Sequence, residues 1–160
     1  MNILVLNGSP KGSYSITLQT VRYLQLKFPE HCFDILHVGQ RIRALEKDFS
    51  PALELLEQAD LLLFSYPVYT FIAPYQLHRF IELLKEQKLS FEGKAATQIT
   101  TSKHFYDVTA HKYIQDNCND LGLKYIRGLS ADMDDLTTEK GQADAEEFFK
   151  LVIWSCENNY

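Results

Sequence analysis

Short apolar runs alternate with longer segments of helical period along the whole chain. The runs predict five strands, at residues 3–6, 32–38, 61–65, 95–100 and 123–129. The segments between and after them predict five helices, at about 16–27, 50–59, 74–85, 108–121 and 142–157. In the first of these helices, Leu18, Val21 and Leu24 fall on one face. Strands that alternate with helices in this way are typical of an α/β protein with a parallel sheet.

The polarity of each strand predicts its place in the sheet. Runs 3–6 and 61–65 are apolar without alternation, which indicates interior strands covered on both faces. The second and fifth strands carry Asp34, Lys124 and Arg127, and charged strands belong at sheet edges. Right-handed crossovers leave the flavodoxin-like order 2-1-3-4-5 and the Rossmann half-fold as common arrangements. The charged edges favour 2-1-3-4-5, a doubly wound five-stranded sheet with helices on both faces, in one domain over residues 1–160.

Composition and charge narrow the classes of protein to which the chain can belong. Its 160 residues are 46% hydrophobic and 23% charged, as in an ordinary globular domain. The net charge is −5 and the basic residues are scattered, which argues against nucleic acid as a partner. No apolar stretch reaches 18 residues, and residues 1–6 fit a buried strand better than a signal peptide. We therefore expect a soluble, cytoplasmic protein without membrane contact, whose Cys32, Cys118 and Cys156 are reduced thiols rather than metal ligands.

The strand order predicts where a ligand binds. In an open α/β sheet the ligand lies beyond the carboxyl ends of the strands, at the point where the strand order reverses. For the order 2-1-3-4-5 this point lies between the first and third strands. The loops at 7–17 and 65–74 should therefore form the site, with the loop at 101–107 beside them.

The first of these loops has the chemistry of a phosphate site. The hydroxyl groups of Ser9, Ser15 and Thr17, together with Lys11, surround the start of a predicted helix near Ile16. A helix N-terminus binds anions through its free N–H groups and its dipole. The loop lacks the Gly-Lys-Ser/Thr ending of a P-loop, and it also lacks the G-x-G-x-x-G pattern of dinucleotide sites. A monophosphate held by hydroxyl and amide groups remains.

Two of the loops resemble those of a known family. Asn-Gly-Ser-Pro-Lys at 7–11, followed by Ser-Ile-Thr at 15–17, resembles the phosphate loop of NAD(P)H-dependent FMN reductases and their iron–sulfur flavoprotein relatives. Tyr-Pro-Val-Tyr-Thr at 66–70 is similar to the segment that holds the isoalloxazine ring there. The chain departs from the family at His78, where relatives often carry lysine, and at Glu82-Leu83, where an Asp-Arg pair is frequent. The resemblance implies FMN as cofactor, NAD(P)H as electron donor, and these cofactor-binding residues: Ser9, Lys11, Ser15, Ile16, Thr17, Pro67, Val68, Tyr69, Thr70, Phe71, Thr101 and Ser102.

The aromatic residues of the second loop leave two interpretations open. Tyr66, Tyr69, Phe71 and Tyr75 lie within ten residues of one another. A flat ring such as flavin needs aromatic or apolar walls, but aromatic residues are also enriched in cores and interfaces. Relatives complete the flavin pocket across a subunit boundary, so the resemblance implies a homodimer or a higher oligomer.

The remaining titratable residues give weaker signals. His104 is a candidate to donate to the flavin or to a quinone-like acceptor, although a loop histidine is usually only solvated. Asp107 fits the N-cap of the helix that follows, and His111 has no evident partners, as is also true of His31 and His37. The acidic run at 132–135 lacks the spacing of an EF-hand, so we expect a solvated turn and no metal.

Three functions fit these patterns. The first is an FMN-dependent oxidoreductase that takes hydride from NAD(P)H and reduces a quinone, a flavin or another small acceptor. No serine- or cysteine-based catalytic triad is visible, and flavin chemistry needs none. The second is an electron-transfer module for a partner protein; without a Cys-x-x-Cys pair, any cluster would lie in that partner. The third is an interaction domain that binds no flavin, which the intact phosphate loop opposes.

Overall fold

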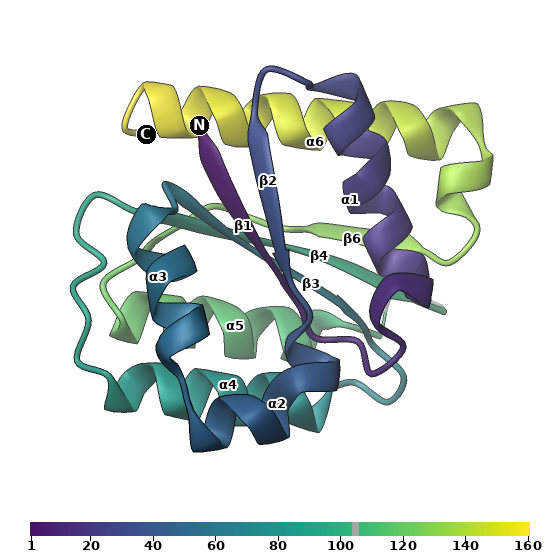
Figure 1. Cartoon of the computed structure of the whole chain (residues 1–160). Coiled ribbons are helices and arrows are strands. Elements are labelled where there is room, and N and C mark those ends of the chain that lie inside the picture. Colours follow the sequence, from purple (N-terminus) through teal and green to yellow (C-terminus); the bar gives the residue numbers. More distant parts are fainter. Residues whose placement is uncertain (104–105) are drawn as a thin grey trace.

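The computed structural model describes residues 1–103 and 106–160. Within these residues the strands form a single parallel sheet in the order β2-β1-β3-β4-β5, and β6 also pairs with β4 (Figure 1). The predicted order 2-1-3-4-5 is confirmed. The strands are β1 (Asn2–Asn7), β2 (Cys32–Leu36), β3 (Leu61–Pro67), β4 (Ala95–Ser102), β5 (Lys124–Tyr125) and β6 (Leu129–Asp132).

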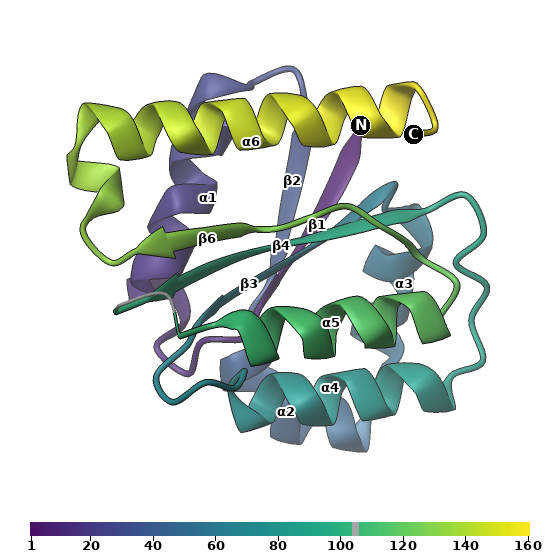
Figure 2. The same cartoon turned by 180° about the vertical axis from the view of Figure 1, so that it is seen from behind.

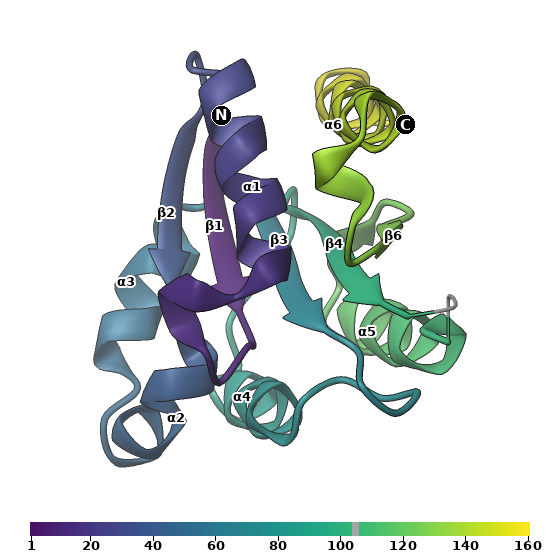
Figure 3. The same cartoon turned by 90° about the vertical axis from the view of Figure 1, so that its right-hand side faces the viewer.

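Helices cover both faces of the sheet, as the sequence predicts. Helices α1 (Ile16–Lys27) and α6 (Glu139–Glu157) lie on one face. The opposite face carries α2 (Val38–Lys47), α3 (Ser50–Gln58), α4 (Tyr75–Glu86) and α5 (Val108–Asp120) (Figure 3). Two short 3₁₀ helices, η1 (Gly12–Tyr14) and η2 (Asp135–Thr137), precede α1 and α6. Among the described residues, no helix has the combined length and apolar character that crossing a membrane requires.

The central strands are buried on both faces because their side chains alternate between two cores. Ile3 and Val5 pack with α1 and α6, whereas Leu4 and Leu6 pack with the helices of the opposite face. Successive side chains of a strand point to opposite faces, so a strand covered on both sides needs an unbroken apolar run. This arrangement explains why the β1 and β3 sequences lack alternation.

One helix, α2, is missing from the sequence-based expectation. The predicted second strand reaches Val38, but β2 ends at Leu36 and α2 begins at Val38. Val38, Ile42 and Leu45 are buried and share one helical face that packs toward α4. The run from Gln40 to Lys47 is otherwise polar and exposed, which hides this helical period.

The predicted fifth strand, 123–129, is also wrong in its extent, because it is divided into β5 and β6. Strand β6 lies beside β4 at the edge of the sheet (Figure 2). Ala96 pairs with Tyr125 and Ile99 pairs with Leu129. Two residues of β4 therefore face three residues of the edge strand, which is the geometry of a β-bulge. At the bulge the backbone of Gly128 lies so close to Gln98 that an added Cβ would be 2.5 Å from the Gln98 carbonyl oxygen.

Candidate functional site

The three predicted loops meet beyond the carboxyl ends of β1, β3 and β4. The Gly8 N–H donates to the Ser65 carbonyl at 2.9 Å, which joins the first loop to β3. The Val68 N–H donates to the Thr101 carbonyl at 2.9 Å, which joins the second loop to β4. The sheet therefore places the loops side by side at the predicted reversal of strand order.

The first loop is folded by hydrogen bonds from its own polar side chains. Asn7 accepts from the Ser9 N–H through Oδ1 at 3.2 Å and donates through Nδ2 to the Gly12 carbonyl at 3.0 Å. Ser9 Oγ accepts from the Lys11 N–H at 3.2 Å. Gly12 has a φ of 54°, a left-handed conformation that favours glycine. These contacts turn the chain toward the start of α1.

Helix α2 supports this loop from outside. The backbone of Gly39 lies so close to Ser9 that an added Cβ would be 2.2 Å from the Ser9 carbonyl oxygen. His37, which precedes α2, lies with Nδ1 3.1 Å from Asn7 Nδ2. Burial, aided by the charges of Arg22 and Arg41, lowers the pKa of His37. A neutral ring is the form that accepts a hydrogen bond from the Asn7 amide.

The N-terminus of α1 provides the expected anion-binding geometry. The N–H groups of the first helical turn have no acceptor within the helix. Ser15 caps one of them, because its Oγ accepts from the Leu18 N–H at 3.4 Å. The N–H groups of Ile16 and Thr17 point the same way along the helix and remain available to a ligand. The Thr17 hydroxyl is buried and pairs with the Thr101 hydroxyl at 2.7 Å.

Two adjoining cavities lie between the loops. The narrow one, of about 10 Å³, lies at the α1 N-terminus, and the wider one, of about 250 Å³, follows toward the third loop. Tyr69 and Met133 line both cavities, so the two cavities are neighbours that share part of their walls. The narrow cavity is lined by Ser9, Lys11, Ser15, Ile16, Pro67, Tyr69, Thr101 and Met133. The wider cavity is lined by Val68, Tyr69, Lys103, Tyr106 and Met133.

A strained turn directly follows Tyr69, which lines the wider cavity. The Ile72 N–H donates to the Thr70 carbonyl at 2.8 Å, and Phe71 between them has a φ of 66°. A three-residue turn with positive φ is uncommon for a residue with a side chain, and such strain clusters at functional sites. The Phe71 ring meets the Tyr106 ring edge-on, with 5.4 Å between the ring centres. The second and third loops therefore touch through two half-exposed aromatic rings.

Within the described residues, Ser102 carries a buried hydroxyl group without a partner, and it lines neither cavity. It follows Thr101 at the end of β4 and is 2% exposed, and its Oγ has no hydrogen-bond partner among the described residues. An unpaired buried hydroxyl costs about 1–3 kcal/mol, so such groups in native structures call for an explanation. A polar ligand edge beside β4 would satisfy it.

The fold and this geometry agree with a comparison of sequence families. The model of a family described as having a flavodoxin-like fold matches residues 1–150. The chain belongs to this flavodoxin-like family. No curated protein matches it significantly.

Solved structures show the same flavodoxin-like fold at low sequence identity. An NADH:FMN oxidoreductase in its apo form has a TM-score of 0.71 and 20% identity, over 92% of this chain and 87% of that one. An FMN-dependent NADH-azoreductase from Bacillus anthracis, in complex with FMN, has a TM-score of 0.64 and 13% identity, over 99% of both chains. An NAD(P)H:quinone oxidoreductase from Methanothermobacter marburgensis has a TM-score of 0.67 and 13% identity, over 99% and 95%.

The predicted site residues of this flavodoxin-like chain are brought together with few exceptions. Eight of them line the two cavities: Ser9, Lys11, Ser15, Ile16, Pro67, Val68, Tyr69 and Thr101. Thr17 contacts Thr101, Ser102 follows it in β4, and Thr70 and Phe71 form the strained turn. His104 lies outside the described residues.

Two residues, Tyr66 and Met133, have other roles than the sequence indicates. Tyr66, grouped with the loop aromatics, is fully buried and donates to Gln98 Oε1 at 2.6 Å, so it belongs to the core. Met133 lies within the acidic run 132–135, and its side chain lines both cavities. Sequence reasoning missed Met133 because the surrounding aspartates indicate only a turn. In the described residues no group of acidic, histidine and cysteine side chains could hold a metal ion.

Proposed function

We propose that residues 1–160 form a single FMN-binding oxidoreductase domain. It would take hydride from NAD(P)H and pass electrons to a quinone, a flavin or another small acceptor. The observation that carries the proposal is the pair of neighbouring cavities across the ends of β1, β3 and β4. One lies at a helix N-terminus and the other has aromatic walls, which suits a ligand with a phosphate at one end and a flat ring at the other.

The phosphate would lie at the start of α1. The N–H groups of Ile16 and Thr17 and the ammonium group of Lys11 are its natural donors, with the hydroxyls of Ser9 and Ser15 beside them. The helix dipole adds about 0.3–2 kcal/mol for an anion at this position. The narrow cavity must widen for a phosphate group, and the Lys11 side chain, which is exposed, can move without disturbing the core.

The flavin ring would lie along the second and third loops. Segment 67–71 would supply one wall, and Thr101, which lines the narrow cavity, would face a polar edge of the ring. Ser102 is the next residue of β4 and is proposed as a neighbour of that edge, although it lines neither cavity. When bound, FMN supplies the redox chemistry, accepting hydride from the nicotinamide and passing electrons to the acceptor. The protein needs only to orient the ring and to exclude water, and Tyr69, Tyr106 and Met133 are placed to do so.

The activities for which the similar structures are named support this proposal. They include an NADH:FMN oxidoreductase, an azoreductase that binds FMN, and a quinone oxidoreductase. Each description combines a nicotinamide donor with flavin or quinone chemistry. The three proteins differ in acceptor, so they support the reaction class and leave the acceptor of this chain open to experiment.

The apolar surface around the cavities suits a second copy of the chain. Large exposed hydrophobic side chains lie in the segments after β1, β3 and β4, including η1 and the first residue of α4: Tyr14, Tyr69, Phe71, Ile72, Tyr75 and Tyr106. Exposed apolar patches of this kind mark interaction sites. We propose a homodimer that covers the cavity mouth, in line with the subunit arrangement implied by the family resemblance.

A reconstitution experiment tests the function. The purified protein is mixed with FMN, desalted, and its visible spectrum is recorded before and after anaerobic addition of NADH or NADPH. We expect retained flavin bands that bleach with the nicotinamide. Bands that are retained without bleaching would favour the electron-transfer module instead. A protein that retains no flavin would overturn the proposal and leave only the fold.

A further inference from the structure

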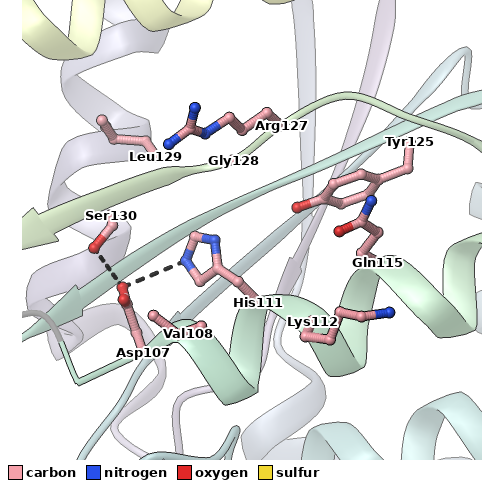
Figure 4. Close-up of a pocket in the computed structure, with 10 residues that line it drawn as sticks. All are labelled: Asp107, Val108, His111, Lys112, Gln115, Tyr125, Arg127, Gly128, Leu129 and Ser130. Carbon is pink, nitrogen blue, oxygen red and sulfur yellow. Dashed lines mark hydrogen bonds and ion pairs between the residues drawn. The ribbon is translucent and has the colours of Figure 1, made fainter.

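A network of polar side chains joins the two ends of the chain segment that borders the wider cavity, the proposed site of the flavin ring. Thr100 precedes this segment and Asp107 follows it, and the Thr100 hydroxyl donates to Asp107 Oδ2 at 2.6 Å. The Ser130 hydroxyl of β6 donates to the same oxygen at 2.6 Å (Figure 4). His111, one turn into α5, lies with Nε2 2.8 Å from Thr100 Oγ1 and 3.4 Å from Asp107 Oδ2. The side chains of β4, β6 and α5 thus converge on one carboxylate.

The protonation states of this network follow from its geometry. Asp107 is 3% exposed, and burial by itself would raise its pKa. Hydrogen bonds from His111, Ser130 and Thr100 outweigh burial, so the pKa of Asp107 lies well below its usual range. The single hydroxyl proton of Thr100 goes to the ionised carboxylate, which can only accept. The Nε2 of His111 lies within reach of both Thr100 Oγ1 and Asp107 Oδ2, so an N–H group there would donate to this pair.

The network is held in place from the sheet. Gln98, buried in β4, donates through Nε2 to the His111 carbonyl at 3.1 Å and accepts from the Tyr66 hydroxyl at 2.6 Å. On its other side, the network borders an open cavity of about 870 Å³ whose wall includes His111 and Ser130 (Figure 4). The bonds to Thr100 and Ser130 therefore tie Asp107 to β4 and β6 at the wall of this cavity.

We propose that Asp107 is a positioning residue for the flavin. Its carboxylate, through Thr100, holds together the two ends of the segment that presents Lys103 and Tyr106 to the wider cavity. The inference rests on the proposed FMN site. It assigns to Asp107, Thr100 and His111 the role of fixing the ring-binding wall, while the phosphate loop at 9–17 is anchored separately by Asn7 and Gly39.

Paired variants of Thr100 test this role. Thr100→Val removes the hydroxyl at nearly constant shape, Thr100→Ser keeps it, and Asp107→Asn removes the charge. The matched control is Lys112→Ala, because Lys112 lines the same open cavity but is exposed and pairs only with Asp116 among the described residues. The measured quantities are the Kd for FMN, the visible circular dichroism of bound FMN, and the thermal stabilisation by inorganic phosphate.

We expect Thr100→Val and Asp107→Asn to raise the Kd for FMN about tenfold and to weaken the visible dichroism, which reports a fixed ring. Thr100→Ser and Lys112→Ala should retain wild-type values, and stabilisation by phosphate should stay unchanged in all variants. A general structural defect would instead reduce the effect of phosphate as well, and that result would overturn the inference.

The remaining outcomes separate the two proposals. Wild-type affinity and dichroism in Thr100→Val would overturn the positioning role and leave the FMN site intact. An equal loss in Thr100→Ser and Thr100→Val would also overturn it, because shape rather than the hydroxyl bond would then matter. If Asp107→Asn fails to fold, the Thr100 pair still decides. A wild-type protein that binds phosphate but no FMN would overturn the proposed function itself, and the inference with it.

Discussion

The hydroxyl groups of Thr17 and Thr101 lie 2.7 Å apart and join the first turn of α1 to the end of β4. Both residues are buried, so this bond connects the proposed phosphate end of the site directly to its proposed ring end. Thr17 was expected from the sequence to donate to phosphate. In the structure its hydroxyl pairs with that of Thr101, so Thr17 also links the two halves of the site.

Removing one hydroxyl of this pair should cost more stability, per hydroxyl, than removing both. Thr17→Val leaves the Thr101 hydroxyl buried without its partner, and we expect the free energy of unfolding to fall by about 1–3 kcal/mol. The double variant Thr17→Val/Thr101→Val removes both polar groups and should be more stable than the sum of the single effects predicts. Urea unfolding of the four proteins in the double-mutant cycle measures this difference. Strictly additive effects would contradict a direct bond between the two hydroxyls.

Gly39 should be intolerant of a methyl group. In an open helix position, Gly→Ala raises stability by about 1 kcal/mol. At Gly39 the added Cβ would lie 2.2 Å from the Ser9 carbonyl oxygen, and backbone cannot yield as a flexible side chain can. We therefore expect Gly39→Ala to lower the midpoint of urea unfolding and to weaken FMN binding through a displaced phosphate loop. Arg43→Ala, at an exposed position of the same helix, is the control and should change neither.

Much of the fold could be predicted from the polarity of its strands. The unbroken apolar runs of β1 and β3 require cover on both faces, and Asp34 and Lys124 exclude their strands from the centre. Elements that depend on tertiary packing could not be predicted from strand polarity. Helix α2 has an apolar face of only three buried residues, and the bulge between β5 and β6 depends on the close approach of Gly128 to Gln98.

The same distinction between local sequence and tertiary packing applies to the residues of the site. Residues in the loops after β1 and β3 could be predicted, because local turn chemistry and family resemblance both indicate them. Asp107 and His111 stand four residues apart, yet the sequence indicates only a helix cap. In the structure Asp107 makes no side-chain cap bond, because its partners Thr100 and Ser130 come from two strands. Met133 was hidden for a related reason, since only the path of the chain after β6 brings it to the cavities.

The Asp107 carboxylate should make the free energy of unfolding decrease as the solution becomes acidic. Its folded-state pKa is lowered, so the unfolded chain binds a proton first as the pH falls. The stability it contributes is complete above the pKa of an unfolded aspartate, about 4, and is lost progressively below that value. We expect the free energy of urea unfolding to fall less steeply in Asp107→Asn than in the wild type as the pH is lowered from about 6 to about 3, a range that brackets this pKa. Parallel pH profiles would show that the carboxylate carries no such stabilisation.

Met133 should contribute to flavin binding through contact area. It lines both cavities, so its removal would open space between the phosphate end and the ring end of the site. We expect Met133→Ala to raise the Kd for FMN several-fold, roughly as the loss of a few buried methylene groups implies. Met133→Leu keeps the volume and should bind nearly as the wild type does. Fluorescence titration of FMN measures both variants, and equal affinity in all three proteins would place Met133 away from the ligand.

The aromatic surface around the cavity mouth should control self-association. Phe71 and Tyr106 are half-exposed and touch edge-on, and a carboxylate at position 71 would be desolvated if a second copy covered it. We expect Phe71→Glu to shift the protein from dimer to monomer in sedimentation velocity runs. Leu26→Glu is the matched control, because Leu26 is 81% exposed on α1, outside the lining of either cavity. A wild-type monomer, or a dimer that survives Phe71→Glu but dissociates with Leu26→Glu, would place the contact between copies elsewhere, and the cavity mouth would then be open to the electron acceptor from solvent.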